Sequence, residues 1–82
     1  MHYAIEFKRL AEKDIRGLSK PVRDRVLQKI ETLRADLAGD VKRLTAFSPE
    51  YRLRVGDWRV LLDLDGSIIV VHRVLHRSEA YH

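Results

Sequence analysis

The chain has 82 residues, no cysteine, a net charge of +4 at pH 7 and an apolar fraction of 45%. This length fits one domain, residues 1–82, with a thin core, and the apolar fraction is that of a folded chain. The lack of cysteine excludes disulfides and thiolate metal sites and agrees with a reducing compartment. No apolar run approaches the ~20 residues that a membrane span needs, so we expect a soluble, cytoplasmic protein without membrane contacts. The basic balance permits a polyanionic partner but does not require one.

The first half of the chain predicts one strand and two helices. Residues 2–7 alternate between apolar and other side chains, which favours a strand, and residues 8–18 carry apolar side chains at helical spacing. A second helix is expected from Ser19 as N-cap, with Pro21 in its first turn, to a stop at Gly39-Asp40. Its apolar stripe consists of Val22, Val26, Ile30, Leu33 and Leu37.

The second half predicts three strands. Residues 41–50 read as irregular; beyond them, Gly56-Asp57 fits a type II′ turn and Asp65-Gly66 fits a type I′ turn. The strands that these turns connect are expected at residues 51–55, 58–64 and 67–75. The predicted fold class is α+β: an N-terminal strand, an αα-hairpin, and an antiparallel three-stranded meander with the helices packed on one face of the small sheet.

Counting outward from two-residue turns gives the expected register. The first turn pairs Val55 with Trp58 and Arg54 with Arg59, and the second pairs Leu62 with Ile69 and Arg59 with His72. One face of the sheet is then almost wholly apolar and should receive the helices. The other face is basic and is expected to carry Arg52, Arg54, Arg59, His72 and, if the last strand stays extended, His76.

Two arginines directly opposed across a ladder repel each other. At ~5 Å the cost is on the order of 1 kcal/mol in water and ~3 kcal/mol at a surface-like dielectric. A bound phosphate or an acidic partner segment would reverse its sign. The plainer interpretation is that this face is only the hydrated side of a half-buried sheet. Arg73 is expected to pair with a helix carboxylate, and Trp58 and Tyr51 are expected to be core aromatics.

Three segments together resemble the RelE branch of the RelE/ParE toxin superfamily, and the resemblance covers essentially the whole chain. They are Tyr51-Arg-Leu-Arg-Val55, Asp57-Trp-Arg-Val60 and His76-Arg-Ser-Glu-Ala-Tyr81. The resemblance implies a RelE-like toxin of a type II toxin–antitoxin system. Such a toxin is an endoribonuclease (an mRNA interferase) that uses no metal or small-molecule cofactor. It inhibits translation by cleaving mRNA in the ribosomal A site, through attack of the ribose 2′-OH on the adjacent phosphate. The implied partners are mRNA, the ribosome and a RelB-like cognate antitoxin.

The resemblance also implies roles for individual residues. Arg59 matches the arginine that stabilises the phosphate, Tyr81 the C-terminal aromatic residue, and His76 and Arg77 the basic pair before it; these form the expected catalytic set. RNA or phosphate binding is assigned to Arg52, Arg54, His72, Lys42 and Arg43.

The general base is left open between two residues. Some relatives have lysines in place of the arginines at positions 52 and 54, and an arginine stays protonated and is a poor base. The base is therefore His76 or Tyr81. His76 is preferred, since an ordinary imidazole titrates near pH 6.5 and a phenol only near pH 10.

Two other functions remain open. ParE-type relatives poison DNA gyrase and cut no RNA, and they share the fold. Alternatively, the basic face only binds a protein, without catalysis. Gyrase inhibition predicts DNA damage with intact mRNA, whereas a binding module predicts that the free protein leaves RNA intact.

Overall fold

The computed structural model describes residues 2–35, 41–43, 49 and 51–80. In this part of the chain, the elements follow one another as β1 (Ala4–Phe7), α1 (Arg9–Arg16), α2 (Lys20–Thr32), β2 (Val41–Arg43), β3 (Tyr51–Val55), β4 (Trp58–Asp65) and β5 (Ile68–His76). This arrangement confirms the predicted α+β class and the N-terminal αα-hairpin. None of the helices in these ranges is long and apolar enough to cross a membrane.

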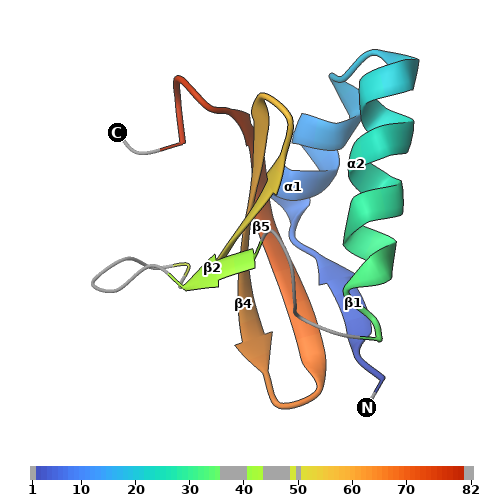
Figure 1. Ribbon diagram of the computed structural model, residues 1–82, viewed down its shortest axis with the longest axis vertical. Coiled ribbons are helices and arrows are strands. Elements are labelled where there is room, and N and C mark those ends of the chain that lie inside the picture. Colours follow the sequence, from blue (N-terminus) through green and yellow to red (C-terminus); the bar gives the residue numbers. More distant parts are fainter. Residues whose placement is uncertain (1, 36–40, 44–48, 50, 81–82) are drawn as a thin grey trace.

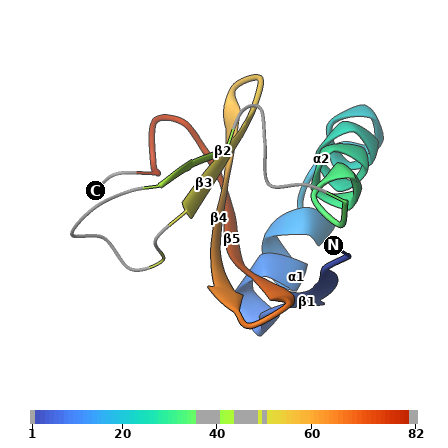
Figure 2. The ribbon, with the colours of Figure 1, turned by 60° about the horizontal axis from the view of Figure 1, so that its bottom comes forward.

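The strands form one sheet in the order β1-β5-β4-β3-β2. The first strand lies parallel to the last, and the remaining neighbours are antiparallel. Both helices lie on one side of the sheet, and the segment that follows β5 turns to the other side (Figures 1 and 2). One face of the sheet is therefore covered by helices, and we call the other the open face.

The core lies between the helices and the apolar side of the strands. Side chains that are almost fully buried come from both layers: Val26, Ile30 and Leu33 from the second helix and its end, and Leu53, Val60, Leu62, Ile69, Val71 and Val74 from the sheet. The predicted stripe of α2 thus packs as expected as far as Leu33. Its last member, Leu37, and the predicted stop at Gly39-Asp40 lie outside the described residues.

The helix boundaries differ from prediction in detail. Ser19 occupies the N-cap of α2, although its side chain makes no capping hydrogen bond. The helix ends at Thr32, with Leu33 as its C-cap. Its end is joined to the first strand, because the backbone N–H of Tyr3 donates to the carbonyl of Arg34 at 2.7 Å.

An ion pair joins α1 to β5. The carboxylate of Asp14 accepts hydrogen bonds from Nε and Nη2 of Arg73, at 2.8 and 3.1 Å, and from the backbone N–H of Val74, at 2.9 Å. The Asp14 carboxylate raises the pKa of the Arg73 guanidinium above its ordinary value. The expectation that Arg73 pairs with a helix carboxylate is confirmed.

Two predictions about the second half were wrong. The segment taken as irregular begins with a short edge strand, β2, which pairs with β3. Three residues are too few to show an alternating pattern, and the charged Lys42-Arg43 is typical of an edge strand protected against further pairing. The second turn consists of Gly66-Ser67, since Asp65 is paired with Ile68. Glycine takes the first central position with φ +60°, as Gly56 does in the first turn with φ +58°.

The expected register holds in the first hairpin and fails in the second. Val55 pairs with Trp58 and Arg54 with Arg59, as predicted. Between β4 and β5, the shifted turn brings Leu62 opposite Val71 instead of Ile69. A shift of two residues leaves each side chain on its predicted face.

A bulge in β5 changes the faces beyond that point. The register shifts by one residue next to Leu61 and Leu62, so Arg59 lies opposite Leu75 instead of His72, and Trp58 lies opposite His76. An extra residue in one strand exchanges the faces of everything after it. His76 consequently lies on the helix-covered face, and its predicted place on the basic face was wrong.

Candidate functional site

Arg59 is the most buried charged residue of the open face, with 8% of its surface exposed. Its Nη1 donates to the carbonyls of Gly56 and Trp58 at 2.7 and 2.9 Å. No carboxylate within the described ranges forms an ion pair with it. Carbonyl dipoles fix the guanidinium in place but leave its full charge uncompensated, which suits binding of an anion.

Two further arginines surround the same turn. Arg54 lies directly opposite Arg59 and is exposed, and it makes no hydrogen bond or ion pair to any described residue. Arg77 donates its backbone N–H to the carbonyl of Asp57 at 2.7 Å, and its Nε lies 3.9 Å from that residue's carboxylate. Both side chains of this pair are about two-thirds exposed, at 64% and 68%, so it stabilises the turn little. We call Arg54, Arg59 and Arg77 the arginine cluster.

The other predicted phosphate-binding residues divide between the two faces. Lys42 lies opposite Arg52, and Arg52 lies opposite Leu61, so the two cations extend the open face toward β2. Arg43 lies opposite Tyr51, a residue of the apolar face. The predicted site therefore keeps Lys42 and Arg52 beside the arginine cluster but places Arg43 on the other side of the strand.

His72 is engaged by a carboxylate. Its Nε2 lies 3.1 Å from Oδ2 of Asp63, and both side chains are about one-third exposed, at 33% and 31%. This pair lies further from the Gly56-Asp57 turn than the arginine cluster does. Asp63 comes after Leu61 on β4, and His72 lies at the bulge on β5. Asp63 orients the imidazole and offsets its charge when His72 is protonated, which weakens the case for His72 as a simple phosphate contact.

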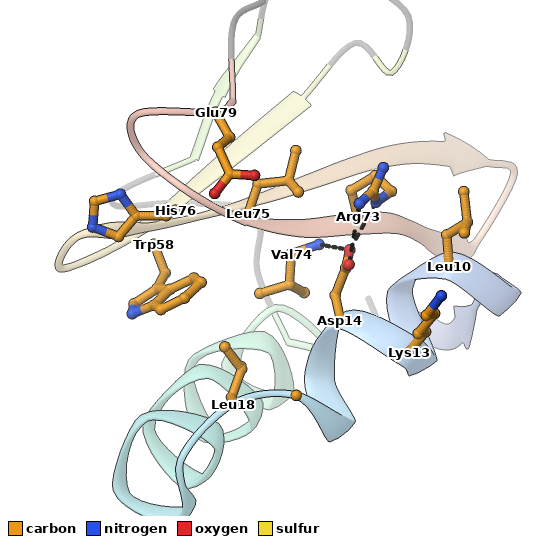
Figure 3. Close-up of a pocket in the computed structure, with 11 residues that line it drawn as sticks. Leu10, Lys13, Asp14, Leu18, Trp58, Arg73, Val74, Leu75, His76 and Glu79 are labelled. Atoms are coloured by element: carbon orange, nitrogen blue, oxygen red, sulfur yellow. Dashed lines mark hydrogen bonds and ion pairs between the residues drawn. The ribbon is translucent and has the colours of Figure 1, made fainter.

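His76 lines a groove on the helix-covered face (Figure 3). The groove has a volume of about 360 Å³ between α1 and the end of β5. Trp58 meets the imidazole edge-on, with ring centroids 5.4 Å apart. Nδ1 of His76 lies 2.9 Å from the hydroxyl oxygen of Ser78 and 3.3 Å from the backbone nitrogen of the same residue, so Ser78 orients the imidazole.

Two further residues bear on the site, one predicted from the sequence and one not. Tyr81 lies outside the described residues. Arg25 of α2 was missed: its guanidinium lies against Gly56, 3.1–3.4 Å from the position of an added Cβ atom. The helical pattern places Arg25 directly before the buried Val26, but only the packed structure brings it to the turn.

The arrangement can bind a phosphodiester and stabilise extra negative charge on it. Guanidinium groups are suited to bidentate contacts with phosphate oxygens, and a partly buried, fixed arginine needs little reorganisation to act on a developing charge. Among residues 2–35, 41–43, 49 and 51–80, no three His, Asp or Glu side chains gather as a metal site would require.

Comparisons with known proteins agree on one family. The family model described as "ParE toxin of type II toxin-antitoxin system, parDE" matches residues 5–81. Toxin RelE3 of Methanocaldococcus jannaschii is 31% identical over 80 residues, which cover 92% of this chain and 91% of that protein.

Solved structures give the same result. The toxin in the RelB–RelE antitoxin–toxin complex from Methanococcus jannaschii has a TM-score of 0.77 and 29% identity, over 93% of this chain and 94% of that one. The archaeal RelE–RelB complex from Pyrococcus horikoshii has a TM-score of 0.80 and 24% identity, over 98% and 100%. The second comparison bears on the fold alone.

Proposed function

Because the chain belongs to the RelE/ParE family of toxins from type II toxin–antitoxin systems, we propose that it is the RelE-like, RNA-cleaving kind of toxin. In this proposal it acts in the cytoplasm as a metal-independent endoribonuclease that cuts mRNA in the ribosomal A site and so inhibits translation. The observation that carries the proposal is Arg59: a buried guanidinium held by carbonyls, opposed by Arg54, with no carboxylate from the described chain to neutralise it.

The reaction needs little more than positioned charges and two proton transfers. The ribose 2′-OH loses its proton and attacks the adjacent phosphorus, and the bond to the 5′-oxygen breaks as that oxygen gains a proton. Arg59 would stabilise the charge that develops on the phosphate, and Arg54 and Arg77 would bind the same group. Arg52 and Lys42, with His72 and Arg43 more remote, would contact neighbouring parts of the RNA.

His76 and Tyr81 are proposed to carry the two protons. His76 stands at the end of β5, directly before Arg77 of the arginine cluster, and an imidazole can act as a base when neutral or as an acid when protonated. The base is therefore His76, as preferred from ordinary pKa values, or Tyr81, and the other residue would supply the proton to the leaving 5′-oxygen. A phenol next to several guanidinium groups is easier to deprotonate than an isolated one.

We also propose that an antitoxin binds this toxin and silences it. The M. jannaschii and P. horikoshii structures are complexes with RelB. Arg54 and Arg59, which form no ion pair with any described carboxylate, call for acidic side chains on such a partner. If co-expression with a RelB-like antitoxin neither restores growth nor yields a co-purifying complex, this part of the proposal fails.

The deciding experiment is mRNA cleavage in a bacterial translation extract supplied with the purified toxin. Cleavage within translated codons is expected from the wild type. Arg59→Gln should lose at least ~10²-fold in rate, the usual scale for removing one transition-state donor. Arg59→Lys keeps the positive charge but removes the paired N–H donors of the guanidinium, so it tests whether bidentate contacts matter. Arg9→Gln, which removes an exposed charge from α1, is the matched control.

The alternative function has its own outcome in this experiment. The matching family model is described by its ParE members, which keeps gyrase inhibition as a second candidate. Intact mRNA in the extract, together with growth arrest and DNA damage in cells, would establish that candidate. The arginine cluster would then be a surface for binding protein.

A further inference from the structure

Two arginines approach Gly56 from opposite faces of the sheet. Arg59 binds the glycine carbonyl from the open face, and Arg25 reaches it from α2. Three atoms of the Arg25 guanidinium, Nη1, Cζ and Nη2, lie 3.1, 3.4 and 3.4 Å from where a Cβ would stand. These nearly equal distances mean that the guanidinium plane lies flat against the glycine. A Cβ atom at position 56 would press on this guanidinium and push it a few tenths of an ångström away.

Arg25 has no partner within the described chain. It is exposed and makes no hydrogen bond or ion pair to any residue in those ranges. An arginine held flat against a backbone turn keeps the N–H groups along its outer edge available. It also continues the positive charge of Arg54 and Arg59 around the end of the β3–β4 hairpin.

A small hollow lies directly beside Arg25. It has a volume of about 150 Å³ and is lined by Val22, Val26, Val55 and Trp58, with Arg25 and Asp57 at its polar side. A cation next to an apolar, aromatic hollow is the combination that a nucleotide requires, since the phosphate and the base need different surroundings. The Asp57 carboxylate can accept a hydrogen bond from a base amino group.

We propose that Arg25, Gly56 and this hollow form a second nucleotide subsite, which binds the RNA nucleotide adjacent to the one held by the arginine cluster. That the ligand is RNA rests on the proposed function. Arg25 binds the phosphate, and the base enters the hollow beside Trp58. The RNA strand therefore passes over the β3–β4 turn, from the open face to α2. Arg25 is a binding residue in this scheme and takes no part in the proton transfers.

The test measures binding rather than cleavage, so that it stands apart from catalysis. The probe is a short single-stranded RNA with 2′-O-methyl groups, which cannot undergo the 2′-OH attack, titrated at several salt concentrations. Arg25→Gln should weaken binding about 3- to 10-fold and reduce the slope of log K against log salt by ~0.7, the value for one phosphate contact on a single strand. Arg9→Gln, with the same change in charge on the other helix, should leave the slope unchanged.

The glycines supply a second matched pair. Gly56 and Gly66 have nearly the same backbone conformation, with φ +58° and +60°. An added Cβ meets Arg25 at position 56 and nothing within 4 Å at position 66. Gly56→Ala should therefore displace the guanidinium and weaken RNA binding, while Gly66→Ala should leave binding unchanged at a similar loss of stability.

The outcomes separate the subsite from the proposed function. If Arg25→Gln binds the probe as Arg9→Gln does while the wild type still cleaves mRNA, the subsite is wrong and the ribonuclease proposal stands. A wild type that fails to bind the probe at low salt also overturns the subsite. If Arg25→Gln instead loses affinity for a purified antitoxin but not for RNA, Arg25 belongs to a protein interface.

Discussion

Asp14 holds the first helix to the last strand, and replacing it offers a direct measure of that attachment. Asp14→Ala removes the acceptor of three hydrogen bonds, one of which comes from the backbone of Val74, a residue only 2% exposed. Leaving that buried N–H without a partner costs about 1–3 kcal/mol. The Arg73 contact adds at most ~1 kcal/mol, because more than a third of that side chain, 37%, is exposed and water screens it.

The sum, roughly 1–4 kcal/mol, is large for this chain, because a domain of its size has a free energy of unfolding of only about 4–12 kcal/mol. Urea denaturation followed by circular dichroism measures the loss directly, and the melting temperature should fall by at least ~4 °C. Asp24→Ala is the matched control, since Asp24 makes an exposed pair with Lys20 on α2. The reasoning is refuted if both variants lose the same amount, or if Asp14→Ala loses less than ~1 kcal/mol.

A double-mutant cycle divides that loss between the two contacts. Arg73→Met keeps most of the aliphatic stem and removes only the guanidinium. If the backbone bond to Val74 dominates, Arg73→Met should cost much less than Asp14→Ala, and the coupling energy between the two sites should stay near ~1 kcal/mol. A coupling energy that equals the whole effect of Asp14→Ala would assign the attachment to the ion pair instead.

Three further predictions concern single positions. Ile30 is 1% exposed, and Ile30→Ala should lower the free energy of unfolding, measured in urea, by about 2–5 kcal/mol. Leu27 on the same helix is 37% exposed, and Leu27→Ala should cost less than ~1 kcal/mol. Equal losses would contradict the assigned buried face of the helix. A hydrogen bond from Lys20 lowers the pKa of the Asp24 carboxyl below its ordinary value of 3.8, so Lys20→Gln should raise the midpoint in an NMR titration. Any stability that this carboxylate provides is present above that ordinary value and is lost as the pH falls through the lowered pKa, and an unchanged midpoint in the variant would refute the assignment. Gly66→Ala should destabilise by roughly 1–2 kcal/mol from its positive φ alone, and a neutral result would mean that the turn adopts another conformation.

Local patterns predicted most of the fold. The alternation of residues 51–55 and the stripe of α2 from Val22 to Leu33 correspond to the observed strand and helix. The first turn was also predicted in the right place, at Gly56-Asp57. In the second hairpin, Gly66 can occupy either central position of a two-residue turn, and nothing local decides between them.

The candidate site was predictable only where it depends on the first hairpin. The pairing of Arg54 with Arg59 follows from counting residues outward from the turn at Gly56, and the structure confirms it. Arg59 is buried and hydrogen-bonded to the turn carbonyls because of tertiary packing, which the alternation of apolar and polar residues in the sequence does not predict. The place of His76 depends on a bulge in β5, which has no glycine or proline to mark it in the sequence. Arg25 reaches the turn from a different element, through the contact between α2 and the hairpin.

The bulge in β5 gives the two halves of one strand separate tasks. Up to Val71, the strand is fixed between β1 and β4, and its alternation serves the core. Beyond the bulge, the same strand presents Leu75 beside Arg59 and turns His76 toward Trp58. Gain or loss of one residue near position 72 would therefore change which side chains appear at the arginine cluster, while the half of the strand before the bulge keeps its partners and the core stays as it is.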